Sequence, residues 1–518
     1  MGNLFFVARF LHPIIAKLLS TPVNQSTSQY RSALKGTSIM GGVQLFQLLI
    51  TVIRAKFIAI ILGTAGMGVS ALLIATLSLI NQTTSLGLSL GAMRSISQAH
   101  QSSDSLLIAR TTTIFRKMVL LTGLLGALVC ALGASLWSNL TFGNSHYFYS
   151  FIIFAPVLLL MALSSAEVAL LQGTGQLKKL ATTSLLGSLV GLLIGIPFYY
   201  LFGTYGIAPA MLALNLSTYL SNRYFTRSIP TNSPKIPLQD ALKIAKPILL
   251  IGLAMTLSTI LATLTTYTLN LFLRYAGSLS DVGLFQAATS ITTQYSSIIF
   301  TALIADYLPR LSAISSNNNS VRSIVNQQGE IILLLITPLI LIILAAAPLL
   351  ISLLMSSEFL PAVPTLRWMA LALLLKAASF TLSYIAFAKG DRTTFLLLEG
   401  IAGSLLNLGF STLGFILFGL EGLGIAMFMS YALYLFITLK VVHTRYAFTL
   451  SRPFLKLFCI LFATTLSLFT IAQTSNSYAL TLTAGIAILI LTIIYCYRQL
   501  NQRTELAAII KKFLQKKN

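Results

Sequence analysis

A lysine stands within an apolar stretch that is typical of a membrane-spanning helix. The stretch LALLLKAASFTLSY covers residues 371–384 and contains Lys376 near its middle. Translocon-based scales assign roughly 2.5 to 3.5 kcal/mol to a lysine at the centre of such a helix. Either the amine pairs with a carboxylate as a structural tie, or it faces an aqueous cavity and binds an anion there. An ammonium group at this depth cannot easily snorkel to the interface, so one of these two arrangements is needed. We favour the aqueous cavity.

Three further cations lie in or beside apolar spans. Arg54 and Lys56 fall in the outer third of the first span, and Arg274 lies at the outer end of the seventh. Together with Lys376 they are the candidate anion-binding residues, since an arginine can hold a phosphate through two parallel hydrogen bonds. Snorkelling would explain Arg54 and Lys56 equally well, and an interfacial position would explain Arg274.

Three carboxylates are candidates for ion coupling. Glu167 and Glu399 lie near the inner ends of their spans, and Asp306 lies near the end of the eighth span. A carboxylate in a low-dielectric setting favours its protonated form, so such a residue can take up and release a proton. Glu399 is the best candidate, and it is also an alternative partner for Lys376. For Asp306, a local ion pair with Arg310 one turn later is the simplest interpretation.

Amide side chains mark the second and eighth spans. Asn81 and Gln82 lie in the sequence NQTTS at 81–85, and Gln294 lies in TSITTQYSS at 289–297. Their amides can hydrogen-bond hydroxyl groups of a ligand, and we favour a shared cavity for the three. The alternative is hydrogen bonding between helices, which in membranes averages about 0.6 kcal/mol per contact.

The composition requires a membrane around these residues. The 518-residue chain is 56% hydrophobic and only 9% charged, whereas about a quarter of the residues in soluble domains carry charge. Fourteen apolar segments are each long enough to cross a bilayer as a helix. They lie at residues 36–63, 66–91, 117–138, 147–172, 180–202, 205–224, 247–273, 283–308, 329–356, 366–389, 395–418, 422–441, 454–473 and 479–497. We therefore expect an all-α polytopic membrane protein with about 14 transmembrane helices.

No pattern typical of an enzyme is found. The three cysteines and four histidines are scattered, and the sequence contains no metal-ligand spacing, phosphate-binding glycine loop or catalytic constellation. We therefore predict that the protein is not an enzyme and needs no cofactor or metal.

The basic residues indicate how the chain is oriented. The formal net charge is +23, and 29 of the 34 lysines and arginines fall in segments that are cytoplasmic if the N-terminus is cytoplasmic. The positive-inside rule predicts this asymmetry for an even number of spans with both termini inside. The charge then indicates contact with anionic membrane lipids, and no nucleic acid is expected as a partner.

The sequence repeats itself at a nearly constant offset. LFGTYGIAPAM at 201–211 resembles LFGLEGLGIAM at 417–427, an offset of 216. Two glycine pairs match at an offset of 215, namely Gly175 with Gly390 and Gly68 with Gly283. These matches indicate duplication of a six-span unit. Because six is even, both copies have the same orientation, and a pseudo-two-fold axis along the membrane normal is expected.

The duplication predicts the domain organisation. The expected parts are a cytoplasmic or interfacial segment at 1–30, a six-helix bundle at 31–224, a basic cytoplasmic linker at 225–246, a second six-helix bundle at 247–445, two additional transmembrane helices at 446–497 and a basic cytoplasmic tail at 498–518. Two such bundles around one central site are the layout expected of an alternating-access carrier.

Several segments resemble bacterial polysaccharide flippases. The segments are KFIAIILGTAGMG (56–68), SDVGLFQAATSITTQY (280–295), SSEFLPAVPTLRWMA (356–370) and LLLKAASFTLSYIAFAKGD (373–391). They are similar to Wzx-type flippases of O-antigen and of enterobacterial common antigen, within the multidrug/oligosaccharidyl-lipid/polysaccharide superfamily. The resemblance covers about residues 31–445. The additional C-terminal pair of spans is a departure from the Wzx pattern and is shared with the peptidoglycan lipid flippases of that superfamily.

The resemblance implies a function and a location. It implies that an undecaprenyl-pyrophosphate-linked glycan moves from the inner to the outer leaflet of the bacterial cytoplasmic (inner) membrane, with coupling to an ion gradient. The candidate cations would then bind the diphosphate. A polysaccharide polymerase and a chain-length regulator of lipopolysaccharide or related biosynthesis are the implied protein partners.

Two alternatives of other classes stay open. A cation-coupled exporter of drugs or small molecules from the same superfamily would carry acidic residues deep in the cavity. A non-transporting scaffold of a polysaccharide assembly complex would require no charge at the membrane midplane.

Overall fold

The computed structural model is built from helices that form two compact units. It describes residues 27–85, 87–101, 105–227, 229, 238–475 and 477–504. The N-terminal unit spans Gly42–Gly283, and the C-terminal unit contains the described residues within Met1–Gly41 and Leu284–Asn518. The predicted segment at 1–30, linker at 225–246 and tail at 498–518 lie partly outside the described residues.

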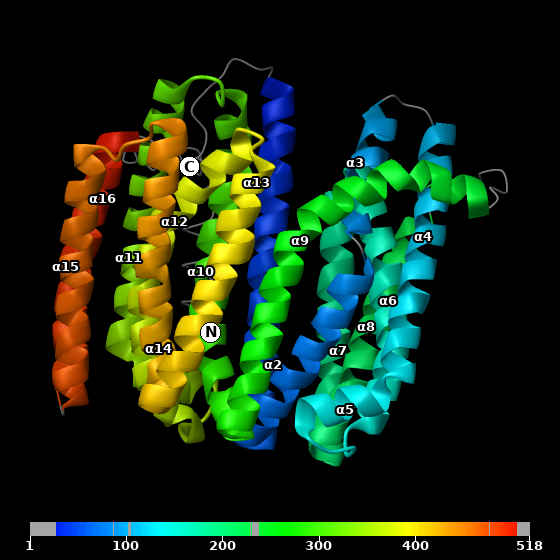
Figure 1. Cartoon of the computed structure of the whole chain (residues 1–518), viewed down its shortest axis with the longest axis horizontal. Helices are drawn as coiled ribbons and strands as arrows, with labels where there is room; N and C mark the ends of the chain where they lie inside the picture. Colours follow the sequence, from blue (N-terminus) through cyan, green and yellow to red (C-terminus); the bar gives the residue numbers. More distant parts are fainter. Residues whose placement is uncertain are drawn as a thin grey trace, which may run out of the picture. The chain divides into compact units, whose positions relative to one another are not determined.

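The N-terminal unit is built from helices (Figure 1). From Gly42 onward its elements are α2 (Thr27–Ser85), α3 (Leu88–Gln101), α4 (Ser105–Leu132), α5 (Ala134–Phe142), α6 (Phe148–Gly173), α7 (Leu177–Phe202), η1 (Gly203–Gly206), α8 (Ile207–Thr226) and α9 (Leu238–Ala276). α4 and α8 both pack against α6, and α7 packs against α8. α9 packs against α3 and α4, so this helix groups with the N-terminal unit although it follows the predicted linker.

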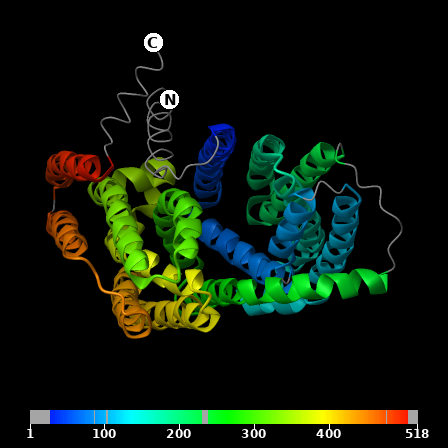
Figure 2. The same ribbon diagram turned by 90° about the horizontal axis from the view of Figure 1, so that it is seen from above.

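The C-terminal unit carries the two additional helices. Its elements are α10 (Leu279–Ala313, from Leu284 onward), α11 (Asn318–Leu354), η2 (Ser357–Ala362), α12 (Val363–Ala388), α13 (Arg392–Phe395), η3 (Leu396–Ala402), α14 (Gly403–Tyr446), α15 (Arg452–Thr474) and α16 (Tyr478–Thr504). α12 packs between α11 and α14. α15 and α16, drawn in orange and red, lie beside α11 in Figures 1 and 2 and pack against it.

The number and length of the helices confirm a polytopic membrane protein. Ten helices in the described part of the chain are long and apolar enough to cross a bilayer. Three of them, Gly42–Ser85, Leu177–Thr226 and Arg392–Tyr446, are interrupted near Gly63, Gly203 and Gly419, so each contains two predicted spans. α10 covers the predicted span at 283–308. The predicted all-α class is therefore confirmed.

Equal backbone geometry recurs at the predicted offset. α6 and α12 each have 26 residues and begin 215 positions apart, at Phe148 and Val363. Gly203 has φ 57° and ψ −133°, and Gly419 has φ 61° and ψ −140°. A residue with a Cβ rarely adopts this conformation, which explains a glycine at both positions. The turns after α6 and α12 also close with the same backbone hydrogen bonds, shifted by 215 positions.

Small residues allow a close helix crossing within the N-terminal unit. A Cβ added to Gly68 would overlap the carbonyl oxygen of Leu279, and one added to Gly283 would overlap that of Thr64. Beside this crossing, the Thr64 hydroxyl donates a hydrogen bond to Ser280 Oγ at 3.1 Å. The two glycine contacts are reciprocal at the offset of 215.

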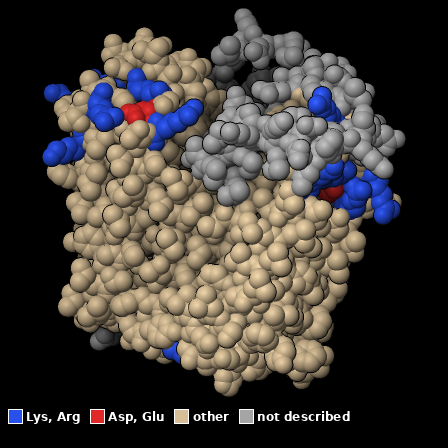
Figure 3. All heavy atoms as spheres, turned by 45° about the vertical axis from the view of Figure 1, so that its right-hand side comes forward, with Lys and Arg blue, Asp and Glu red and all other residues tan. Residues whose placement is uncertain are grey.

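On the face drawn in Figure 3, most of the visible lysine and arginine side chains, and the visible acidic ones, lie near the upper edge, and one basic side chain lies at the lower edge. A broad uncharged band separates the two edges on this face. Hydrocarbon tolerates only such uncharged surface, so the band agrees with a lipid-facing surface.

Candidate functional site

Lys376 lies between two aromatic rings in the C-terminal unit. This half-buried residue projects from α12, and its Nζ lies 5.4 Å from the ring centroid of Phe300 on α10 and 5.8 Å from that of Tyr431 on α14. Cation–π contacts of this kind contribute about 0.5–2 kcal/mol. Among the described residues, no carboxylate lies within ion-pair distance of the amine. The tie to a carboxylate is therefore not found there, and within the described part of the chain the positive charge has no counter-ion.

A row of aromatic rings leads away from Lys376 along α12. The Phe300 ring centroid lies 4.7 Å from that of Phe380, which lies 5.0 Å from that of Tyr384. The Tyr384 centroid lies 6.1 Å from that of Phe395, the residue directly before η3. The row therefore connects the surroundings of Lys376 with the segment that carries Glu399.

Glu399 lies in an irregular turn of its helix. Residues Leu396–Ala402 form the π-helix η3, a geometry that is rare and frequently found at functional sites. The hydroxyl of Tyr434 on α14 donates a hydrogen bond of 2.9 Å to Glu399 Oε1. Within the described part of the chain, Glu399 forms no ion pair, so its expected pairing with Lys376 is not found.

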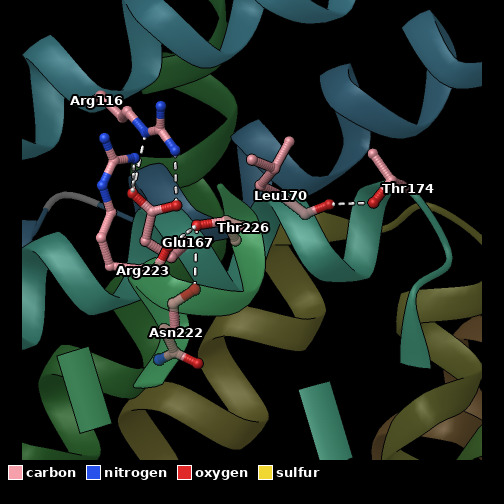
Figure 4. A network of polar contacts seen from close by, with 7 residues as sticks. All are labelled: Arg116, Glu167, Leu170, Thr174, Asn222, Arg223 and Thr226. Carbon is pink, nitrogen blue, oxygen red and sulfur yellow. Dashed lines mark hydrogen bonds and ion pairs between the residues drawn. The ribbon is translucent and has the colours of Figure 1, made fainter. Parts of the chain in front are cut away.

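Glu167 forms the main ion cluster of the N-terminal unit (Figure 4). Arg116 of α4 donates to both carboxylate oxygens, from Nε to Oε1 at 3.0 Å and from Nη2 to Oε2 at 2.7 Å. Arg223 of α8 donates from Nη1 to Oε1 at 3.3 Å. The Glu167 side chain is only 4% exposed, against 23% for Arg116 and 42% for Arg223.

This ion cluster joins three helices. A buried carboxylate is tolerated when cations and hydrogen bonds compensate its lost hydration, and the paired guanidinium of Arg116 supplies both. Beside it, the Asn222 amide donates to Ser164 Oγ at 2.7 Å and links α8 to α6 again. The arrangement explains Glu167 as a structural tie, and its role in ion coupling stays a prediction.

The other candidates of the N-terminal unit lie on α2. Gln82 Nε2 donates to Thr259 Oγ1 of α9 at 2.8 Å, which is the helix-to-helix bond of the alternative interpretation. Arg54 is half-buried and acts electrostatically on the buried Tyr199 of α7. Lys56 and Asn81 are also half-buried.

Two arginines, the predicted Arg274 and also Arg367, cap helix ends. In the N-terminal unit, Arg274 Nη2 donates to the carbonyl of Phe142, the last residue of α5, at 3.1 Å. In the C-terminal unit, Arg367 Nη1 donates to the carbonyl of Ala472 in the last turn of α15 at 2.6 Å. Cations are favourable at helix C-termini because they satisfy free carbonyls and oppose the macrodipole. This geometry favours the structural interpretation of Arg274.

Two predicted residues remain on α10. Gln294 is half-buried in the C-terminal unit. The side chain of Asp306 lies outside the described residues, so its predicted pairing with Arg310 is not described. Of the predicted residues, the structure places Lys376, Glu399 and Gln294 in the C-terminal unit and Arg54, Lys56, Asn81, Gln82, Glu167 and Arg274 in the N-terminal unit.

A second polar cluster closes the predicted inner end of the C-terminal unit. Asp391 caps α13 by accepting from the Thr394 amide at 3.0 Å and its hydroxyl at 2.8 Å. The Tyr446 hydroxyl and Arg445 Nη1 each donate to Asp391 Oδ2 at 2.9 Å. The Thr394 backbone amide, with these side-chain donors, lowers the pKa of Asp391 to about 2. Lys389 adds hydrogen bonds to the Ser315 carbonyl and to Asn318 Oδ1, so the cluster joins three connections between helices.

The partners of the ionisable residues are not recognisable in the sequence. Arg116 and Arg223 are two of many basic residues in inner segments, yet they lie 51 and 56 positions from Glu167 in the chain and meet it in space. Tyr431 and Tyr434 belong to an apolar span with no distinguishing pattern. For Tyr434, the sequence offers only one indication of a polar partner, namely its hydroxyl group within an apolar span.

The comparisons with known proteins agree with this architecture. The sequence profile described as "Polysaccharide biosynthesis protein" matches residues 57–364, more than half of the chain. The Lipid III flippases of Escherichia coli (strain K12) and Shigella flexneri are each 25% identical to this chain over 359 residues, which cover 66% of this chain and 82% of theirs.

Two solved structures share the fold. An inward-facing multidrug resistance transporter of the MATE family superposes with a TM-score of 0.68 at 18% identity, covering 79% of this chain and 98% of its own. The lipid II flippase MurJ, in an inward closed conformation, gives 0.67 at 15% identity, covering 89% and 99%. The chain therefore shares the fold of these two proteins.

Proposed function

We propose, since this chain belongs to the polysaccharide biosynthesis protein family, that it flips an undecaprenyl-pyrophosphate-linked oligosaccharide from the inner to the outer leaflet. The membrane is the bacterial cytoplasmic membrane, both termini are cytoplasmic, and an ion gradient drives alternating access. The likeness to the Lipid III flippases supports a lipid-linked glycan as the transported class. A polysaccharide polymerase and a chain-length regulator are the proposed protein partners.

The observation that carries the proposal is the charge of Lys376. This amine lies within a transmembrane helix between two aromatic rings, and no carboxylate among the described residues forms an ion pair with it. These surroundings favour an anionic ligand. A diphosphate offers that charge at the junction between the lipid tail and the sugar. The half-buried amides of Asn81 and Gln294 are proposed to bind sugar hydroxyls, and Arg54 and Lys56 to assist with the diphosphate. The hydrogen bonds of Gln82 and Arg274 to neighbouring helices favour a structural role for these two predicted residues.

The decisive test replaces Lys376 in cells that carry no other copy of the gene. The Lys376→Ala protein should reach the membrane at normal levels and leave the cells without the surface polysaccharide, because the diphosphate has lost its cation. Lys440→Ala is the matched control, since Lys440 is an exposed lysine on α14. Normal polysaccharide with Lys376→Ala, at equal membrane level, would contradict the proposal and favour a non-transporting scaffold.

One observation supports a second candidate, a cation-coupled exporter. Glu399 is a carboxylate within a transmembrane helix that forms no ion pair in the described part of the chain, and such a group attracts organic cations. Binding to the purified protein separates the candidates. The flippase should bind undecaprenyl pyrophosphate, with weaker binding after Lys376→Ala, whereas the exporter should bind ethidium and lose it after Glu399→Gln.

A further inference from the structure

The two repeats differ by one residue within a single helix. Gly175 and Gly390 precede equivalent helices at an offset of 215, whereas Gly203 and Gly419 end them at an offset of 216. The stretch between these glycines therefore contains one residue more in the C-terminal unit than in the N-terminal unit.

The π-helix η3 accommodates this extra residue. α7 is a continuous α-helix from Leu177 to Phe202, whereas its counterpart contains η3 between α13 and α14. A π-turn widens an α-helix by one residue while the helix continues, so η3 is the local form that an insertion would take. The irregularity is thus an addition of the C-terminal unit, and Glu399 lies at its centre.

The groups facing Glu399 are neutral. From α14, the Tyr434 hydroxyl donates to its carboxylate, and Tyr434 itself is only 6% exposed. From α12, Tyr384 interacts with it electrostatically. α13 contains one charged residue, Arg392, which is exposed. Within the described residues, Glu399 therefore has hydroxyl neighbours and no ion-pair partner, unlike Glu167.

Such surroundings allow a carboxylate to change its protonation state. Two arginines strongly stabilise the anionic form of a carboxylate. A carboxylate that accepts one hydrogen bond from a neutral hydroxyl has a smaller difference in free energy between its anionic and protonated forms. The row of rings from Tyr384 through Phe380 and Phe300 leads from this carboxylate to Lys376.

We infer that Glu399 is the proton-carrying residue of the transport cycle, an inference that rests on the proposed flippase function. A proton from the outer side binds a carboxylate oxygen of Glu399 and gives the neutral acid. In the opposite conformation, the acid releases that proton to water on the inner side and the carboxylate returns. Tyr434 donates its hydrogen bond to the anion and keeps its own proton throughout.

The first experiment needs no lipid substrate. Infrared difference spectra of the purified protein in lipid nanodiscs, recorded over a pH titration, should contain the carbonyl stretch of a protonated carboxylic acid. The component of this band that belongs to Glu399 should be missing from the Glu399→Gln spectrum, and it should shift in frequency in Tyr434→Phe, which loses the hydrogen bond. Glu421→Gln is the matched control, because Glu421 also accepts hydrogen bonds, from Trp368 and Gln473. A band that Glu399→Gln leaves unchanged overturns the inference.

The second experiment separates this inference from the proposed function. Proteoliposomes receive a fluorescent polyprenyl-pyrophosphate-linked N-acetylglucosamine and an imposed pH gradient. The wild-type protein and Glu421→Gln should move the probe faster with the gradient, and Glu399→Gln should move it equally fast with and without. A gradient response in Glu399→Gln overturns the inference while flipping stands. If the wild-type protein moves no probe, the flippase proposal fails, and the infrared titration alone decides the role of Glu399.

Discussion

The equivalent helices α6 and α12 each contain a charged residue, and the surroundings of these two residues differ. Both have 26 residues and begin 215 positions apart. α6 contains Glu167, which two arginines neutralise, and α12 contains Lys376, which meets two aromatic rings. At the equivalent position of Glu167 on α12 (167 + 215 = 382) stands the buried Leu382. The two helices therefore share their backbone geometry and differ in their charged residues.

The two charged groups also differ in how readily each could change its partner. A carboxylate bound to two guanidinium groups resists change, because separation of either pair would leave an unpaired charge in a low dielectric. An amine that contacts only aromatic rings can bind an anion at the cost of weak cation–π contacts. In the described residues, Glu167 of the N-terminal unit is thus held by two arginines, whereas Lys376 and Glu399 of the C-terminal unit have no ion-pair partner.

The largest expected effect comes from the Glu167 cluster. Arg116→Met should lower the free energy of unfolding by about 3 kcal/mol, because a buried carboxylate loses its two-bond partner. Arg223→Met is the matched control and should lower it by about 0 to 1 kcal/mol, since Arg223 is 42% exposed and bonds at 3.3 Å. Reversible unfolding in mixed micelles measures both values. Equal losses for the two variants would break the comparison.

The duplicated breaks test whether the backbones are truly equivalent. Gly203→Ala and Gly419→Ala should each lower the free energy of unfolding by roughly 1–3 kcal/mol, since alanine is strained at these positive φ values. The same unfolding assay applies. If one substitution is tolerated and the other is not, the two breaks are not equivalent and the repeat is weaker than the dihedral angles indicate.

Lys376 should behave unlike Arg116 in the same assay. Lys376→Met should change the free energy of unfolding by less than about 1 kcal/mol, because the lost cation–π contacts are offset by removal of a buried charge. A loss as large as that of Arg116→Met would reveal a strong partner for Lys376 and would contradict an amine reserved for a ligand.

The smallest expected effect concerns the Asp391 cluster, which is partly exposed. Its pKa of about 2 lies below the ordinary 3.8, so the folded state favours the anion. The resulting stabilisation is present above about pH 4 and is lost as the pH falls through about 2. Thermal unfolding midpoints across this range should fall less steeply for Asp391→Asn than for the wild-type protein. Equal slopes would show that the hydrogen bonds to Asp391 do not persist in solution.

Much of the fold follows from the sequence alone. Apolar segments of about 20 residues are recognised from local composition, and they form helices because a bilayer leaves no other partner for their backbone polar groups. The asymmetry of the basic residues is likewise a property of local composition. The glycines at 203 and 419 marked both the repeat and the breaks, because positive φ excludes most side chains. The change of offset from 215 to 216 is present in the sequence, but only the structure shows the π-helix that accompanies it.

The tertiary structure decided which ionisable residues are neutralised. Glu167 and Glu399 look alike in the sequence, as carboxylates near the inner ends of spans, yet one meets two arginines and the other a tyrosine. Gln82 and Arg274, predicted to bind a ligand, donate hydrogen bonds to neighbouring helices. The physical reason is that a charge in low dielectric is governed by the few groups within hydrogen-bond distance, and helix packing brings these together from distant parts of the chain.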